Sequence, residues 1–133
     1  MKRRKTRTVF LGGIPVGSGH PVSIQSMTKT DPRDFGSTIS QIKRLEQAGC
    51  DIVRVAVPDL EAADALAVIK EHISIPLVAD IHFNYRLAVE AAARGADKLR
   101  INPGNLSKPE HVEAVVAAAA GQHPARGLLG GVE

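Results

Sequence analysis

A seven-residue pattern occurs twice in this chain and restricts its fold more than any other feature. Gly49–Val55 reads GCDIVRV and Gly95–Ile101 reads GADKLRI, so both copies fit G-x-D-x-[VL]-R-[VI]. In each copy a glycine suited to ending a helix precedes a short run with apolar residues at alternate positions, which predicts a β-strand. The distance between the copies fits two short strand–helix units. The two arginines are therefore expected on alternate strands of one sheet, at one height and pointing at one place.

Segments with similar alternation come before and between the two copies. They predict four strand–helix units, with strands at 22–28, at 51–57, at 77–83 and from Lys98 to a turn at 102–105. We expect the first helix to begin near Ser37 or Thr38, because Thr38 and Gln41 have the spacing of a capping box. Strands that alternate with helices define an α/β fold with parallel (β/α) units and right-handed crossovers. Four such units make about half of a TIM (β/α)8 barrel.

The 133 residues divide into three regions. Residues 1–7 are predicted to be a basic, flexible tail, and 8–121 a partial (β/α)8 barrel that opens with an N-terminal β-hairpin. Residues 122–133 are glycine-rich and lack alternation where a fifth strand is due, so we expect an irregular C-terminal end of the kind that truncation or a frame shift produces. The composition, 44% hydrophobic with 3% aromatic residues, suits helices packed on a buried parallel sheet.

The charge distribution and the single cysteine limit the kinds of partner, and the cellular compartment, that we expect for this protein. The net charge of +3 comes from five basic residues in the tail, without which the chain would be slightly acidic. This distribution argues against a nucleic-acid-binding face. The single cysteine, Cys50, excludes a disulfide framework within the chain, and no apolar run reaches the roughly 18 residues of a membrane span. We therefore expect a soluble, cytoplasmic protein with neither nucleic acid nor membrane as a partner.

Polar residues recur at the ends of the predicted strands, all on one face. They are Gln25, Arg54, Asp80, His82, Arg100 and Asn102. Ligands of parallel α/β sheets bind at the carboxyl ends of the strands, so this set is a candidate site. One interpretation is an internal ion-pair layer in which Asp80 pairs with an arginine. The other is an anion site, because Asp80 alone cannot neutralise Arg54, Lys98 and Arg100.

The roles of His82 and Arg86 stay open, and Cys50 is set aside. His82 could be a general acid, a phosphate ligand or a histidine satisfied in the core. Arg86 falls in the first turn of a predicted helix, where anions are favoured, but it could equally be a solvated arginine. Cys50 lies at a helix-to-strand junction at the opposite end of the predicted barrel, and we expect it to be buried and inert. No cysteine or histidine cluster has the spacing of metal ligands.

Four segments together closely resemble one enzyme family. They are Ile24–Thr28 (IQSMT), Ala48–Pro58 (AGCDIVRVAVP), Leu77–Phe83 (LVADIHF) and Lys98–Asn105 (KLRINPGN). The resemblance is to the 4-hydroxy-3-methylbut-2-enyl diphosphate synthases of the methylerythritol phosphate pathway of isoprenoid biosynthesis, and it runs from about Arg3 to Ala120. It implies a (β/α)8 barrel that binds 2-C-methyl-D-erythritol 2,4-cyclodiphosphate, opens the ring and removes an oxygen reductively.

The resemblance also implies cofactors, partners and residue roles. Two electrons come from flavodoxin or ferredoxin through a 4Fe–4S cluster on a C-terminal domain, which closes over the barrel of the partner in a homodimer. By motif position Arg54 and Arg100 clamp the diphosphate and Asn102 hydrogen-bonds it. The candidate catalytic residues are Asp80 and His82. The candidate substrate-binding residues are Gln25, Met27, Arg54, Arg86, Lys98, Arg100, Asn102, Gly104 and Asn105, and no metal ligand is expected in this chain.

The chain departs from the family pattern after the fourth helix. No regular fifth strand follows, and the cluster domain with its three cysteines and a glutamate is not in the sequence. Two functions of different class are therefore expected. The chain is either the N-terminal part of the iron–sulfur oxidoreductase, carrying part of its diphosphate site, or a non-catalytic half-barrel fragment that binds phosphorylated ligands or associates with other chains. In either case we expect the chain alone to be inactive.

Overall fold

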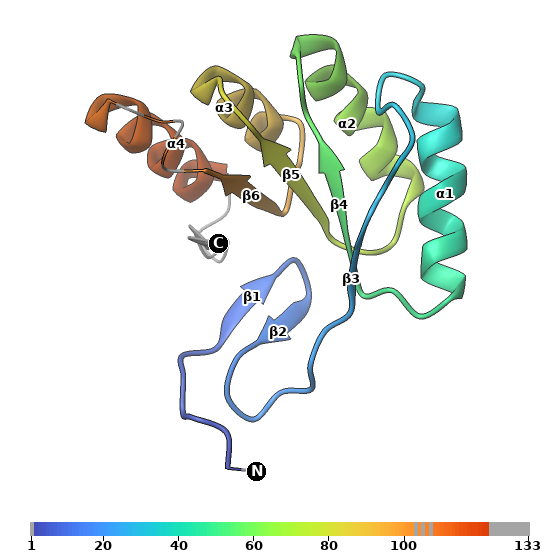
Figure 1. Ribbon diagram of the computed structural model, residues 1–133, viewed down its shortest axis with the longest axis vertical. Helices are drawn as coiled ribbons and strands as arrows, with labels where there is room; N and C mark the ends of the chain where they lie inside the picture. The colour runs from blue at the N-terminus through green and yellow to red at the C-terminus, as the bar shows by residue number, and fades with distance from the viewer. Residues whose placement is uncertain (1, 103, 105, 107, 123–133) are drawn as a thin grey trace.

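The computed structural model describes residues 2–102, 104, 106 and 108–122. Four parallel strands form a sheet in the order β3-β4-β5-β6, and helices α1 to α4 cover its outer face (Figure 1). The strands of this sheet are β3 (Gln25–Met27), β4 (Ile52–Ala56), β5 (Leu77–Ile81) and β6 (Lys98–Ile101). The helices are α1 (Phe35–Gln47), α2 (Leu60–His72), α3 (Tyr85–Ala93) and α4 (Pro109–Gln122). The predicted class, an α/β fold with four parallel units of a partial barrel, is confirmed.

The two faces of the sheet differ in character because side chains alternate along a strand. On the outer face, valines of β4 and the alternate residues of β5 and β6 pack against the helices in the main core, with Val53, Val55 and Val57 fully buried. The ladder aligns Met27 with Arg54 and Asp80 with Arg100, so these residues share the inner face. The inner face is therefore the polar one.

The antiparallel hairpin of β1 (Val9–Leu11) and β2 (Ile14–Val16) confirms the predicted N-terminal hairpin and lies at the amino ends of the strands (Figure 1). Leu11 is 3% exposed and packs on Ile52 and Val78, which belong to the inner face of β4 and β5. Gly12 in the turn has φ +57, and a Cβ there would meet the Pro76 ring at 2.9 Å. The hairpin thus supplies the apolar cover that the lower part of the inner face would otherwise lack.

The aspartate of the repeated pattern ties neighbouring strands together. Gly49 and Gly95 end α1 and α3 with φ +98 and +105, a region that favours glycine. Asp51 then accepts a hydrogen bond from the Ile24 N–H at 2.8 Å, and Asp97 accepts one from the Leu77 N–H at 2.9 Å. Each aspartate therefore anchors the start of the strand beside its own, which explains why the two copies match at this position.

The strand predicted at 77–83 is too long, since β5 ends at Ile81, and two predicted starts are also wrong. The first strand of the sheet covers only Gln25–Met27 and not 22–28, since the Ile24 N–H donates to the Asp51 carboxylate and not to a backbone carbonyl of β4; Val22 and Ile24 are 79% and 60% exposed. Helix α1 begins at Phe35 because Asp34 caps it by accepting from the Ser37 N–H at 3.2 Å. Gln41 instead accepts a hydrogen bond from the Lys29 N–H at 2.9 Å, so its carboxamide braces the preceding loop.

The structure describes the two ends of the chain to different extents. The side chains of Thr6 and Ser18 hydrogen-bond the segment before β1 to the loop that follows β2, and Arg3 donates to the His20 carbonyl at 2.7 Å. Helix α4 continues through Gln122, whereas residues 123–133, most of the predicted irregular end, lie outside the described residues. Among the helices that the structure describes, none combines the length and apolar character needed to cross a bilayer.

Candidate anion-binding site

A buried acid lies between two arginines at the carboxyl ends of the strands. Asp80, which is 1% exposed, accepts from Arg54 Nε and Nη2 at 3.0 and 2.7 Å through Oδ2. Its other oxygen, Oδ1, accepts from Arg100 Nη1 at 3.1 Å. Both arginine side chains keep 20% of their surface exposed. We call these three residues the Asp80 cluster.

The strand ladder explains how the arginines of the repeat reach the same carboxylate. Arg54 pairs with Val78 and Arg100 pairs with Asp80, so in the ladder the two arginines are one inward-facing position apart. Asp80 lies on the central strand between them and is reached from both sides. The structure thus contains the ion-pair layer that the sequence left open as one interpretation, and it brings both arginines together.

Among the three residues of the Asp80 cluster, positive charge exceeds negative charge. Within the Asp80 cluster one carboxylate faces two guanidinium groups, and Lys98 shares the inner face, level with Val78 in the ladder. Arg100 Nε is buried and has no hydrogen-bond partner among the described residues. A buried donor without an acceptor costs about 1–3 kcal/mol, and more when it is charged. The cluster is therefore suited to an anion that brings acceptor oxygens.

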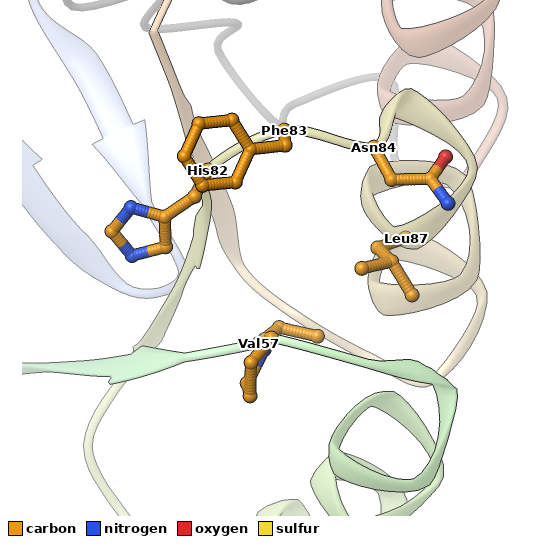
Figure 2. Close-up of a pocket in the computed structure, with 6 residues that line it drawn as sticks. Val57, His82, Phe83, Asn84 and Leu87 are labelled. Carbon is orange, nitrogen blue, oxygen red and sulfur yellow. The ribbon is translucent and has the colours of Figure 1, made fainter.

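His82 lies at the rim of the same site. It follows β5, is 45% exposed, and its Nε2 lies 3.5 Å from Asp80 Oδ2. His82 is also among the residues that line a pocket of about 160 Å³, together with Val57, Pro58, Phe83, Asn84 and Leu87. In Figure 2, Val57 at the end of β4 and Leu87 of α3 both lie on the side of the strand end that faces the helices. The His82 ring points to the other side of the strand end.

The remaining predicted site residues surround the cluster at different distances. Met27 is level with Arg54 on the neighbouring strand and is 41% exposed, and Gln25 is exposed on the same face. Asn102 follows β6, and its Oδ1 accepts from the Gly104 N–H at 3.0 Å, so its carboxamide shapes the turn. Asn105 lies outside the described residues.

Arg86 belongs to a separate part of the surface. Its guanidinium lies 5.9 Å from the Tyr85 ring centroid, and a hydrogen bond to Tyr85 raises the pKa of the arginine. The Tyr85 ring in turn stacks on His111 at 3.9 Å. These residues line a depression on α3 and α4 rather than the inner face of the sheet. The structure therefore does not bring Arg86 into the Asp80 cluster.

Sequence reasoning missed the brace that holds the loop between β3 and α1. Arg33 donates to both oxygens of Asp31, and its Nη1 reaches Asp59 at 3.1 Å. Asp59 at the same time caps α2 by accepting from the Ala62 N–H at 2.9 Å. The alternating charges at 31–34 were the available signal, but contact with Asp59 depends on the packing of α1 beside α2.

The donor atoms present do not fit an iron–sulfur cluster. The sequence has one cysteine, Cys50, and its thiol is 3.0 Å from the Ile52 carbonyl at the amino end of β4, away from the Asp80 cluster. Within the described part of the chain no three His, Cys, Asp or Glu side chains are grouped as metal ligands. A 4Fe–4S cluster needs several cysteine thiolates. No step of the chemistry is therefore assigned to such a group here.

The fold and the site define a barrel-type α/β protein with a cationic site at the carboxyl ends of its strands. Residues 6–126 match the family model of the GcpE TIM-barrel domain, and the chain belongs to this family.

Curated relatives carry the name 4-hydroxy-3-methylbut-2-en-1-yl diphosphate synthase (flavodoxin). The protein of Thermodesulfovibrio yellowstonii is 58% identical over 119 residues, which are 90% of this chain and 34% of the relative. That of Anoxybacillus flavithermus is 62% identical over 117 residues, 88% of this chain and 32% of the relative. The chain thus spans about a third of the length of these relatives.

A solved structure supports the fold alone. The dihydropteroate synthase of Yersinia pestis aligns with 84% of this chain and 43% of its own, with a TM-score of 0.62 and 14% sequence identity.

Proposed function

We propose that this chain binds the diphosphate of the substrate of a 4-hydroxy-3-methylbut-2-en-1-yl diphosphate synthase, as the N-terminal part of that enzyme. The observation that carries the proposal is the Asp80 cluster, in which two arginines share one buried carboxylate at the carboxyl ends of parallel strands. The printed name of the relatives supplies the class of ligand, a diphosphate ester. By the family resemblance the substrate is 2-C-methyl-D-erythritol 2,4-cyclodiphosphate.

The roles of the side chains follow from their exposure and contacts. Arg54 and Arg100 donate to the phosphate oxygens, because a guanidinium offers several N–H groups in a planar fork. Asp80 is too buried to meet the ligand directly, so it positions the two arginines, each held by a different carboxylate oxygen. His82 is exposed at the rim beside the cluster and is the group there that we propose to exchange a proton with a bound ligand.

Catalysis needs components that this chain does not supply. The relatives' name includes flavodoxin, and we propose flavodoxin or ferredoxin as the electron donor of the complete, homodimeric enzyme in the cytoplasm. By itself the chain binds its ligand and does not turn it over. Supplied anaerobically with iron, sulfide, substrate and reductant, it should form no product above a protein-free control; turnover there would contradict the assignment of reduction to the rest of the enzyme.

Calorimetric titration with inorganic pyrophosphate tests the binding site. Each of Arg54→Ala and Arg100→Ala should weaken binding by roughly 10- to 150-fold, because a charge-assisted hydrogen bond contributes roughly 1.5–3 kcal/mol. Arg54→Lys should recover only part of the affinity, since a point charge lacks the planar fork. The double alanine variant should show non-additive losses, because both side chains act on one ligand group.

Arg94 provides the matched control. It is the C-cap residue of the outer helix α3, where it pairs with Asp64 at 2.6 Å, and Arg94→Ala should leave pyrophosphate binding unchanged. Circular dichroism of each variant separates lost binding from lost folding. Equal binding by Arg54→Ala and the parent, in folded protein, would contradict the proposed site.

A further inference from the structure

We infer that Lys29 is a further ligand of the diphosphate and that Gln41 is the residue that positions it. This inference rests on the proposed function, because it takes the anion to lie on Arg54 and Arg100. From the sequence, Lys29 is one of several charged residues in a polar loop and has no place in the candidate site. The strand register and the hydrogen bonds around Lys29 give it one.

The parallel ladder continues beyond the last residue of β3. Met27 pairs with Arg54, and the Thr28 N–H donates to the Arg54 carbonyl at 3.0 Å, which is the next hydrogen bond of a parallel ladder. In Figure 1 the chain runs on in the direction of β3 before it turns towards α1. Thr28 is 7% exposed and shares the outer parity of the strand, whereas Lys29 is exposed. Because successive side chains point to opposite faces, that of Lys29 belongs to the inner face.

The register also places Lys29 in the same row across the sheet as Asp80. One inward-facing position beyond the end of β3, Lys29 is level with Ala56, which pairs with Asp80, and Asp80 pairs with Arg100. Neighbouring strands are about 4.8 Å apart. Ala56 contributes only a methyl group, so it leaves space between the lysine and the carboxylate. Arg54 is the preceding inward-facing residue of β4, next to this space.

An anion in the space above Ala56 would have cations on several sides. Arg54 and Arg100 share a single carboxylate, that of Asp80, so one positive charge of the Asp80 cluster is not compensated within it. A diphosphate brings acceptor oxygens on two phosphoryl groups. Lys29 reaches such a ligand from the β3 side through its flexible four-carbon stem, and an ammonium group binds phosphate as a compact point charge.

Gln41 holds the backbone on which Lys29 depends. The N–H of Lys29 points away from β4, since that of Thr28 points towards it, and β3 has no other neighbour among the described residues. Gln41 Oε1 accepts from the Lys29 N–H at 2.9 Å and from the Thr30 N–H at 3.4 Å. The hydroxyls of Thr30 and the buried Thr38 lie 2.8 Å apart, which fixes the loop to α1. A backbone held in this way lowers the entropic cost of binding.

Calorimetric titration of the 133-residue chain with inorganic pyrophosphate tests the role of Lys29. Lys29→Met keeps a long stem and removes the charge, so it should weaken binding about tenfold, the lower end of what a charge-assisted hydrogen bond contributes. Lys29→Arg retains the charge and should restore most of the affinity. Lys43→Met is the matched control at an exposed lysine of α1, and it should leave the affinity unchanged.

A double-mutant cycle tests the role of Gln41. Gln41→Met removes the acceptor oxygen with little change in size, and it should weaken pyrophosphate binding about three- to tenfold by loosening the loop. In a Lys29→Met background the same change should have no effect on binding, because Gln41 acts through Lys29. Gln47→Met, at the exposed last residue of α1, should have no effect in either background. Equal weakening by Gln41→Met in both backgrounds would overturn the positioning role.

The outcomes distinguish this inference from the function on which it rests. Unchanged pyrophosphate affinity in folded Lys29→Met, together with weakened binding in Arg54→Ala, would overturn the inference and leave the arginine site standing. Absence of pyrophosphate binding by the parent chain would overturn both. If Lys29→Met does not fold, NMR of the parent replaces it: the Lys29 Cε resonance should shift on addition of pyrophosphate, and that of Lys43 should not. An unshifted Lys29 resonance in pyrophosphate-bound protein would overturn the inference.

Discussion

Asp80 connects the interior of the sheet to its exposed end. The residue is 1% exposed, yet each carboxylate oxygen holds an arginine that still reaches solvent. A charge removed from water is tolerated when it is paired and fully hydrogen-bonded. The alternation of the strands was enough to predict that these residues share a face. The distances between Asp80 and the arginines depend on how β5 aligns with β4 and β6. The alternation of residues does not predict that alignment.

Replacing Asp80 should destabilise the fold far more than replacing an exposed aspartate. Asp80→Asn leaves two guanidinium groups close together without a counter-charge, and breaking a buried pair in this way costs about 3–5 kcal/mol. Asp64→Asn removes the half-exposed pair with Arg94 and should cost about 0–1 kcal/mol. Urea unfolding measures both free energies. Similar midpoints for the two variants would show that the Asp80 cluster is already well solvated.

Two exposed carboxylates near α1 should titrate below their ordinary pKa of 3.8. The side-chain hydrogen bond from Arg33 lowers the pKa of Asp31, and that from Ser37 lowers the pKa of Asp34. A lowered pKa means that the stabilising contribution is complete above the ordinary value and is lost as the pH falls through the lowered one. NMR titration should show the Asp31 pKa rising towards 3.8 in Arg33→Gln while that of Asp34 stays low. An unchanged Asp31 pKa in the variant would contradict the assigned cause.

At the scale of secondary structure, the sequence predicts the presence of an element more accurately than the residue at which the element begins. The hairpin and all four strand–helix units are present, because alternating apolar residues and helix-ending glycines are local signals. The errors lie where a boundary depends on a neighbour. Helix α1 begins at Phe35 because Asp34 outcompetes Thr38 as its cap. The β3 ladder begins only at Gln25 because the Ile24 N–H donates to the Asp51 side chain and not to a backbone carbonyl of β4.

The site was predictable to a similar extent. Arg54, Asp80 and Arg100 were found from parity alone, whereas Arg86 was expected from its place in a first helical turn and lies apart from them. Helical geometry places a residue at a helix end but not the direction of a long side chain. The pocket beside His82 could not be foreseen, since Val57 and Leu87 meet through the packing of α3 on the sheet.

The hairpin should contribute measurably to stability through Leu11. This residue is 3% exposed and covers Ile52 and Val78, so Leu11→Ala should cost about 2–5 kcal/mol by deleting buried methyl groups and leaving a cavity. Leu60→Ala, at a leucine that is 55% exposed, should cost much less. Thermal and urea unfolding compare the two variants. Equal stability would mean that the hairpin packs only loosely on the sheet.

At the scale of the whole molecule, the sheet ends in two strands that each have one neighbour among the described residues, β3 and β6. Backbone N–H and C=O groups along such edges can pair with another chain. We therefore expect concentration-dependent self-association, measured by sedimentation velocity. Ile24→Lys, a charge beside β3 at a side chain that is 60% exposed, should weaken it, whereas Leu60→Lys at a similar exposure on α2 should not. A monomer at every concentration, with cooperative melting, would show that the half-barrel is self-sufficient.

The position of the hairpin also affects the order of events during translation. Its strands leave the ribosome before those of the sheet, but Leu11 rests on Val78, which follows much later in the chain. At about 5–20 residues per second, the nascent hairpin waits several seconds for β5 to emerge. During that interval Leu11 has no native surface to cover and is available to chaperones. The hairpin is therefore synthesised before the sheet but is expected to reach its native contacts only after β5 has emerged.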